Sequence, residues 1–342
     1  MTLIDAIYIH NSGGKVLLEI LIKKILKTNL NSFFFLFDSR LEKSLISNID
    51  PNSFKILKAS EYNRAIFYRN KYRKFYHYFC FANVPPPIQL NKPVTIYFHN
   101  DLILDSKNSG VGFLKRFKFQ IKKKYIYFNN NKNYHWVVQT SLMMKKLSNE
   151  FKINPKKIYV LPFFNELVSF FERPVIKNTF LYVANYSPHK NHEKLIKAFQ
   201  EVAFKTDKKI ILKLTLEEKQ FDLLIQKTNY FTSNFLLINL GILTKDALLK
   251  SYQEANFFIY PSLKESFGLP LVEAAIFSGY ILASDLDYIH EVVIPSLTFN
   301  PYNKSEIASV ILKVLNLKKV KESKLKVSNK IDDLLTHITN YV

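Results

Sequence analysis

The residues best suited to chemistry lie in one stretch of the second half, Pro261 to Ala275 (PSLKESFGLPLVEAA). It follows an apolar run typical of a strand, and Gly268 and Pro270 suit the first turn of a helix. The N–H groups and the dipole of a helix start attract phosphate or sugar oxygens. Glu265 and Glu273 flank this start, and a carboxylate can accept two hydrogen bonds from a vicinal diol. The stretch therefore predicts a site for an anionic, hydroxyl-rich ligand.

This stretch resembles the E-x7-E signature of the family 4 (group 1) glycosyltransferases, a retaining family with the GT-B fold. The string E-S-F-G-L-P-L-V-E-A after a strand carries the resemblance. The resemblance implies that Glu273 holds the donor ribose and Glu265 the donor sugar. It also places backbone amides around the sugar and phosphate, namely those of Phe267, Gly268 and Leu269. The structural alternative is two solvated glutamates beside a helix cap.

A second stretch, Tyr182 to Phe199 (YVANYSPHKNHEKLIKAF), looks like the family's first C-terminal strand-to-helix loop. In that loop a lysine neutralises the donor diphosphate as it leaves, and the resemblance assigns this role to Lys190. The family usually adds an arginine after the strand, where this chain has Asn185. The second cation is therefore absent or supplied elsewhere, and a solvated loop lysine is the structural alternative to a donor-binding Lys190.

The first half carries weaker matches to the same family. Gly13 and Gly14 follow the first predicted strand and allow close backbone approach to an anion or sugar, although a glycine pair can also end a strand for conformational reasons. His99 follows another strand, where the family has a histidine near the donor sugar; a structural histidine is equally open. Asp101 is a candidate carboxylate on the acceptor side. The catalytic residues implied are His99, Lys190 and Glu265.

Two further motifs have ordinary structural explanations. The stretch from Val138 to Leu142 resembles the family's strand-to-helix junction at the cleft, but a helix cap by Thr140 or Ser141 explains it equally well. The triplet Asp285-Leu286-Asp287 is of the kind that holds a metal in GT-A enzymes. We expect it to cap the next helix instead, and we expect neither a metal nor another cofactor.

The order of elements predicts an α/β fold. Short β-branched or aromatic runs alternate with longer amphipathic ones in both halves, which is typical of βαβ units and parallel sheets. We expect GT-B architecture, with two doubly wound, Rossmann-like domains facing a cleft. The expected domains are an acceptor-binding domain over residues 1–163, a nucleotide-sugar-binding domain over 164–320, and a basic helix over 321–342 that packs back on the first domain. We expect the linker between the domains within Phe163 to Asn178, where Arg173-Pro174 interrupts any regular pattern.

Composition narrows the class of protein. The chain has 342 residues, 48% of them hydrophobic and 23% charged, which is typical of a globular protein with room for two domains. Its single cysteine, Cys80, cannot form an intramolecular disulfide, and this favours a reducing compartment. The N-terminus lacks the pattern of a secretory signal, so we expect a cytoplasmic protein.

The positive charge is concentrated in the first half. Residues 1–165 hold 27 Lys and Arg against 9 Asp and Glu, a balance of +18, whereas residues 166–342 hold 22 against 19, a balance of +3. This asymmetry predicts that one domain faces an anionic surface. The stretch Lys115 to Phe128 has an aromatic stripe with lysines on other faces, so it predicts a helix that lies on a membrane or packs its stripe on the sheet.

Together with the resemblance, this charge suggests a nucleotide-sugar donor and a carbohydrate acceptor carried on a polyprenyl diphosphate. The protein would then be peripheral on the inner face of the cytoplasmic membrane and act in O-antigen, capsule or lipopolysaccharide synthesis. Three alternatives remain: a sugar-nucleotide epimerase on the same fold, a basic nucleic-acid-binding protein, and a catalytically silent partner subunit. No nucleic-acid motif is present, so we expect no nucleic-acid partner.

Overall fold

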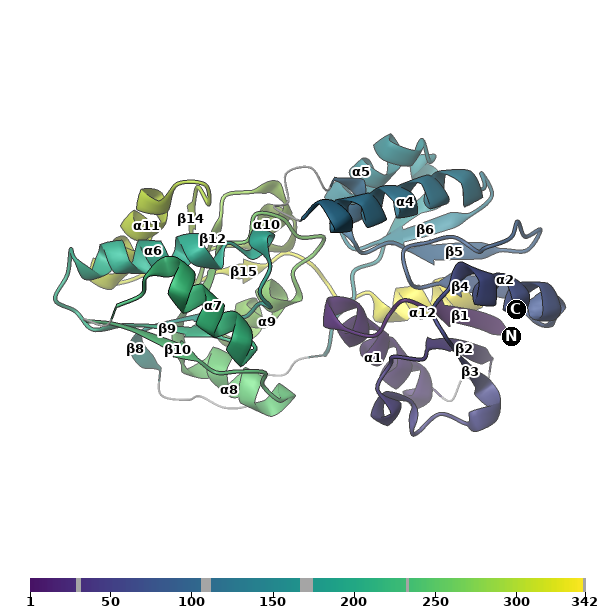
Figure 1. The fold of residues 1–342 in the computed structure, drawn as a ribbon, viewed down its shortest axis with the longest axis horizontal. Coiled ribbons are helices and arrows are strands. Elements are labelled where there is room, and N and C mark those ends of the chain that lie inside the picture. The colour runs from purple at the N-terminus through teal and green to yellow at the C-terminus, as the bar shows by residue number, and fades with distance from the viewer. Residues whose placement is uncertain (29–31, 106–111, 167–174, 232–233, 341–342) are drawn as a thin grey trace. The chain divides into compact units, whose positions relative to one another are not determined.

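The computed structural model describes residues 1–28, 32–105, 112–166, 175–231 and 234–340 (Figure 1). These residues form two compact units. The first unit contains the described residues up to 105, those from 113 to 166, and those from 328 to the C-terminus; the second contains those from 175 to 327. The predicted boundary at Arg173-Pro174 lies outside the described residues.

The first unit is built on a parallel sheet. Its strands, as far as the structure describes the chain, follow the order β3-β2-β1-β4-β5-β6-β7. They are β1 (Thr2–Ala6), β2 (Phe33–Asp38), β3 (Phe54–Leu57), β4 (His77–Cys80), β5 (Val94–Tyr97), β6 (His135–Val138) and β7 (Ile158–Val160). The order reverses between β1 and β4, and ligands of doubly wound sheets bind at the carboxyl ends of the strands at such a switch point.

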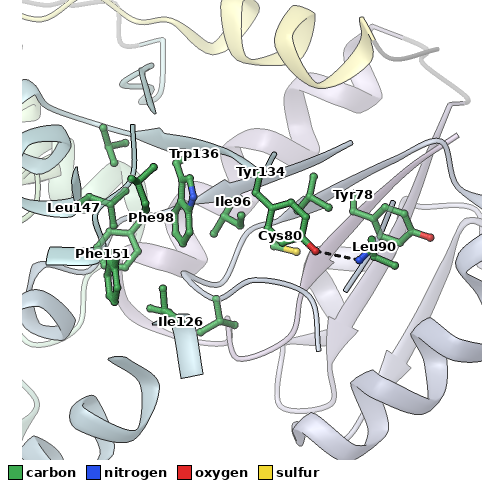
Figure 2. Close-up of a cluster of buried hydrophobic side chains, with 14 of the residues drawn as sticks. Tyr78, Cys80, Leu90, Ile96, Phe98, Ile126, Tyr134, Trp136, Leu147 and Phe151 are labelled. Atoms are coloured by element: carbon green, nitrogen blue, oxygen red, sulfur yellow. Dashed lines mark hydrogen bonds between the residues drawn. The ribbon is translucent and has the colours of Figure 1, made fainter. Parts of the chain in front are cut away.

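Helices connect these strands. They are α1 (Ser12–Lys27), α2 (Glu61–Lys71), α3 (Asp101–Leu104), α4 (Phe113–Asn129) and α5 (Ser141–Phe151), with short 3-10 turns at Lys43–Ile46, Pro51–Ser53, Tyr72–Lys74 and Pro155–Lys157. Trp136, Phe98 and Leu147 are fully buried in a core that α4 enters with Ile126 (Figure 2). The Tyr134 hydroxyl accepts a hydrogen bond from the Leu90 N–H at 3.2 Å, which satisfies a polar group inside this core.

The C-terminal helix belongs to the first unit, not the second (Figure 1). Helix α12 (Ile331–Thr339) contacts α1 and β4. The Thr2 hydroxyl donates to the Ile338 carbonyl at 3.1 Å, and Lys24 pairs with Asp332 at 2.8 Å. The helix is shorter than the basic helix expected over 321–342. It is also not basic, because the lysines of this segment precede it and its own first turn holds Asp332 and Asp333.

The second unit repeats the architecture. Its described strands form a parallel sheet in the order β10-β9-β8-β11-β12-β14. They are β8 (Ile176–Tyr182), β9 (Ile210–Leu214), β10 (Phe235–Asn239), β11 (Ala255–Tyr260), β12 (Ile281–Ser284) and β14 (Leu297–Phe299), with a small antiparallel pair of β13 (Val293–Ile294) and β15 (Lys324–Leu325). The switch in strand order lies between β8 and β11, so their carboxyl ends are the place to look for a ligand.

The helices of the second unit are α6 (His192–Ala203), α7 (Glu218–Thr228), α8 (Lys245–Glu254), α9 (Leu269–Phe277), α10 (Asp287–Val292) and α11 (Lys304–Asn316), with a 3-10 turn at Pro188–Lys190. Two parallel α/β sheets of this kind confirm the predicted fold class. In the part of the chain that the structure describes, no helix combines the length and apolar character needed to cross a bilayer.

The structure departs from the predicted elements where single residues override the pattern. The apolar run from Leu3 to Ile9 predicts one strand, but β1 ends at Ala6 because Tyr8 has a positive φ of 80°. Strand β4 is not predicted, because it lies at the end of the basic aromatic stretch from Arg64 to Phe79. All four of its residues are nevertheless buried. Strand β14, of three residues, is also missed.

A buried ion pair joins β1 to α2 in the first unit. Arg64 and Asp5 are each 1% exposed, and the guanidinium donates to Asp5 from Nε at 3.0 Å and from Nη2 at 2.8 Å. The Tyr68 hydroxyl donates to the same carboxylate oxygen at 2.8 Å. The remaining guanidinium nitrogen, Nη1, binds Glu61 at 2.8 Å. Each charge is therefore compensated, which a buried ion pair requires.

We predict that Arg64→Met destabilises the first unit by about 3–5 kcal/mol, because Asp5 would keep a buried charge without its cation. Arg69→Met is the matched control, since Arg69 is exposed on the same helix, and it should change the free energy of unfolding by less than about 0.5 kcal/mol. Urea unfolding followed by far-UV circular dichroism measures both. Equal midpoints for the two variants would show that the ion pair contributes nothing to stability.

Candidate functional site

Two loops at the switch point of the second sheet carry most of the predicted site residues. One follows β8 and contains Asn185 and Lys190; the other follows β11 and contains Glu265. Strands β8 and β11 are paired in parallel, so both loops leave the same edge of the sheet. Their place in the fold explains why residues far apart in the sequence meet here.

Backbone and hydroxyl contacts bind the two loops to each other. The Leu263 N–H donates to the His189 carbonyl at 2.7 Å. The buried Tyr182 hydroxyl, at the end of β8, donates to the Lys190 carbonyl at 2.8 Å and lies 3.0 Å from the Ser262 hydroxyl. The Asn191 amide donates to the Pro261 carbonyl at 3.2 Å. These contacts fix the backbone that presents Lys190 and Glu265.

Lys190 and Glu265 form an ion pair through Nζ and Oε1. Their side chains are only 13% and 14% exposed, so the pair is largely shielded from water. Burial acts to raise the pKa of Glu265, but the Lys190 ammonium, the nearby His189 and hydrogen bonds from Lys190 and Ser262 outweigh it and hold the pKa below its ordinary value. Glu265 is therefore ionised at neutral pH.

Helix α9 begins beside this loop, as the sequence predicts. Gly268 occupies the N-cap position with φ of +87°, a conformation that glycine adopts without strain, and Pro270 lies in the first turn. A Cβ atom on Gly268 would lie 3.0 Å from Leu271 Cδ1, so the turn has little room for a side chain. Phe267, 2% exposed, anchors the turn in the core, and Leu269 opens the helix.

Glu273, in the second turn of α9, has a different environment. The Tyr252 hydroxyl of α8 donates to its Oε2 at 2.9 Å. Burial raises the pKa of Glu273 to about 7, although Tyr252 and the positive charge of Lys245 act to lower it. The two glutamates of the E-x7-E motif thus differ in charge state, because only Glu265 has a lysine in direct contact.

The structure also places Asn185 and the hollows of this unit. Asn185 is exposed just after β8. One hollow, of about 350 Å³, is lined by residues that include Tyr186, Asn191 and Lys194, and another, of about 390 Å³, by residues that include Asp285 and Tyr302. Neither of these two linings contains Lys190, Glu265 or Glu273. The ion pair and the helix start define the candidate site.

The Asp285-Leu286-Asp287 triplet does not cap a helix as expected. Leu286 is the N-cap residue of α10, with no side-chain cap, and Asp287 is its first residue. Asp285 instead pairs with His290 at 2.7 Å. Asp285 does not cap α10 because its side chain reaches past the first turn to His290, in the second turn of that helix. Within the described ranges, no group of three or more His, Cys, Asp or Glu has a geometry that could hold a metal.

In the first unit, His99 and Gly14 lie together at the carboxyl edge of the sheet. A Cβ atom on Gly14 would lie 3.2 Å from His99 Nε2, so the glycine permits the close approach of α1. The Asn83 Oδ1 accepts from the His99 N–H at 2.7 Å. Burial, with Lys122 near by, lowers the pKa of His99 to about 3, so the imidazole is neutral at pH 7.

The other predicted residues of this unit have structural partners. Asp101, 3% exposed, is the first residue of α3 and forms an ion pair with Lys146 of α5 at 2.9 Å. Gly13 has open space where a side chain would stand. Thr140 caps α5 by accepting from the Met143 N–H at 3.2 Å, which confirms the ordinary explanation of the stretch from Val138 to Leu142.

Sequence reasoning missed the residues that hold the site together. These partners are Tyr182 and Ser262, which support the loop of Lys190, and Tyr252, which binds Glu273. Nothing in the spacing of these three residues in the sequence indicates those contacts. For Asn83 the sequence offers only a weak indication, namely that asparagine tolerates a positive φ. Asn83 has φ of 67° just after the end of β4. Side chains that act through other side chains leave little trace in one sequence.

Comparison with known proteins defines the class first. The structure of Anabaena Alr3699/HepE in complex with UDP and glucose matches with a TM-score of 0.67 at 11% identity, over 98% of this chain and 95% of that one. Two parallel-sheet α/β units with this match define a two-domain GT-B fold.

The sequence matches a family model over its second half. Residues 163–330, just under half of the chain, match the family described as "Glycosyl transferases group 1". This region contains every candidate residue of the second unit. The N-terminal candidates, His99, Asp101, Gly13 and Gly14, lie outside it.

Curated relatives match over a limited segment. The serotype-specific mannosyltransferase WbdA of Escherichia coli is 31% identical over 139 residues, which is 40% of this chain and 17% of the relative. The O-antigen chain mannosyltransferase B of Escherichia coli is 30% identical over 137 residues, which is 40% of this chain and 36% of the relative. The chain thus matches well under half the length of either relative.

We predict that Glu273→Gln stabilises the second unit at pH 8 by about 1–3 kcal/mol. The folded-state pKa of about 7 exceeds the ordinary value of 4.5. The folded protein therefore loses stability as the pH rises from about 4.5 to 7, and its stability does not fall further above pH 7 through this group. The amide has no charge to bury. Calorimetric unfolding at pH 8 and pH 4 measures the difference, which should vanish at the lower pH. An equal effect at both values would exclude ionisation as its cause.

Proposed function

We propose that this chain is a retaining glycosyltransferase that moves a sugar from a nucleoside diphosphate sugar to a carbohydrate acceptor. The observation that carries the proposal is the shielded ion pair of Lys190 and Glu265 beside the start of α9. A cation, a carboxylate and a helix start suit the phosphates and hydroxyl groups of such a donor. The match of residues 163–330 to the group 1 glycosyltransferase family supports the same chemistry.

Lys190 would stabilise the leaving group. In the structure the charge of Lys190 is balanced by Glu265. A bound diphosphate would offer a second, stronger anionic partner, and negative charge grows on that diphosphate as the glycosidic bond breaks. A cation already in place stabilises such a charge without rearranging solvent. Glu265 would then accept hydrogen bonds from the sugar.

The helix start would complete the phosphate and sugar contacts. The backbone amides of Phe267, Gly268 and Leu269 lie where α9 begins, and the positive end of the helix dipole favours an anion there. Lys190 and these amides supply positive charge to the diphosphate, so we propose that the reaction needs no metal. Asn185 would leave the donor with one fewer cation than is usual in the resembling family.

Glu273 would hold the donor ribose. An ionised carboxylate can accept hydrogen bonds from both hydroxyl groups of a diol, whereas a protonated one must donate a bond itself. Since burial raises the pKa of Glu273 to about 7, the accepting form becomes more abundant as the pH rises through neutrality. Donor affinity should therefore increase between pH 6 and pH 8.

The first unit would supply Asp101 for the acceptor, and His99, Gly13 and Gly14 for the donor sugar. With its pKa lowered to about 3, His99 is neutral and would position a hydroxyl group instead of delivering a proton. Gly13 and Gly14 would allow close approach of the ligand to α1. Asp101 would have to share its carboxylate between the acceptor and Lys146. We propose that the leaving group departs and the acceptor attacks on the same face of the sugar, with Glu265 accepting hydrogen bonds instead of acting as a nucleophile.

The acceptor class rests on the named relatives. Both Escherichia coli relatives are mannosyltransferases, and one is an O-antigen chain enzyme. We therefore propose a hexosyl or deoxyhexosyl transfer, with mannose as the first candidate, in O-antigen, capsule or lipopolysaccharide synthesis. A polyprenyl-diphosphate-linked oligosaccharide on the cytoplasmic face of the membrane is the proposed acceptor.

A thermal-shift series across UDP-, GDP- and dTDP-sugars tests the donor site. A ligand that binds only the folded state raises the apparent melting temperature. We predict that Lys190→Ala and Glu273→Ala each abolish the shift seen with the preferred donor, because each removes a donor contact. Lys219→Ala is the control, since Lys219 is exposed on α7, and it should respond like the wild type. Wild-type shifts in both site variants would refute the assignment.

Product analysis tests the reaction itself. The preferred donor is incubated with a lipid-linked oligosaccharide, with and without EDTA, and the new linkage is determined by NMR. An α-linked product from an α-donor, formed equally well with EDTA, is the expected result. A β-linked product would refute retention, and loss of product with EDTA would refute metal independence.

A further inference from the structure

Helix α4 exposes a continuous apolar face. Its outward residues are Phe113 (80% exposed), Leu114 (76%), Phe117 (58%), Ile121 (53%) and Phe128 (75%). Spacings of four and seven residues place these side chains on one side of a helix. Among the described residues, no other helix carries more than two large hydrophobic side chains that are exposed. The helix has 17 residues, so the face runs for about 25 Å.

The remaining sides of α4 are fixed by contacts within the first unit. Ile126 is its one buried residue, and it enters the core shown in Figure 2. The Tyr125 hydroxyl donates to Glu61 Oε2 at 2.7 Å, and Lys123 pairs with Glu150 of α5 at 2.7 Å. Phe119 packs against the same core. These contacts set the rotation of the helix, so the apolar face is turned outward by the fold.

Basic residues accompany this face. Lys124 lies among the exposed apolar residues, Lys118 lies at their edge, and Lys115 stands in the first turn; all three are exposed. The first 165 residues carry a balance of +18 (27 Lys and Arg against 9 Asp and Glu). A bilayer containing acidic lipids has an anionic surface above an apolar interior. An apolar helix face bordered by cations is complementary to such a bilayer.

We propose that α4 is a membrane-docking helix that lies in the surface of an anionic bilayer. Phe113, Phe117, Ile121 and Phe128 would enter the boundary between head groups and acyl chains. Lys118 and Lys124 would contact lipid phosphates. The inference goes beyond the proposed reaction and does not require it, because it concerns a surface whose occupancy is measured without any sugar.

Vesicle flotation of the full chain tests the proposal. The wild type should bind vesicles of phosphatidylcholine with phosphatidylglycerol much more strongly than vesicles of phosphatidylcholine alone, because cations and apolar residues act together. The variant Phe117→Gln/Ile121→Gln keeps the net charge and removes only apolar contact. We predict that it weakens binding to the anionic vesicles at least about tenfold. Lys118→Gln/Lys124→Gln should weaken binding to the anionic vesicles only.

A matched control is available in the second unit. Phe204 follows α6 and is 77% exposed, so Phe204→Gln removes a comparable apolar side chain away from α4, and it should bind like the wild type. Unchanged melting temperatures confirm that the variants fold. Wild-type vesicle binding by Phe117→Gln/Ile121→Gln, or no binding by the wild type, would overturn the proposal. So would sedimentation showing that the substitutions dissolve a dimer, since the face would then cover a second copy.

Discussion

The second unit depends on keeping Lys190 and Glu265 charged and in contact where water is scarce. Removing two ions from water is costly, and their attraction offsets that cost only when the geometry is held. The structure holds it through the backbone: the two loops are joined by the Leu263 N–H and the His189 carbonyl, and by the Tyr182 hydroxyl. The same contacts leave Lys190 positioned and only 13% exposed.

The two glutamates of the motif show how position on one short segment can produce two chemical states. Both carboxyl groups are removed from water, and burial acts to raise the pKa of each. Lys190 reverses the effect at Glu265, whereas Tyr252 and the more distant charge of Lys245 only reduce it at Glu273. Glu265 is therefore ionised at neutral pH, whereas Glu273 changes charge near neutral pH. Different environments commonly divide the roles of paired carboxylates in this way.

The sequence predicted what depends on local pattern. The helix start at Gly268, the strand before it and the loop with Lys190 are all short-range features, and the structure has them where they were expected. The contacts that give them their properties are long-range. Tyr252 lies 21 residues from Glu273, and Arg64 lies 59 residues from Asp5. Such pairs meet because of the order of the strands in the sheet, and a single sequence does not reveal that order.

Helix α4 shows the same limit from the other side. Its aromatic stripe was compatible with packing on the sheet or with exposure, because periodicity says that a face exists and not which way it turns. The direction comes from a chain of contacts that begins in the core. Asp5 holds Arg64, Arg64 holds Glu61, and Glu61 accepts the Tyr125 hydroxyl of α4. Ile126 is turned into the core, so Phe117 and Ile121 on the other side of the helix turn outward, and the network of the buried ion pair holds Tyr125 at the edge of that outward face.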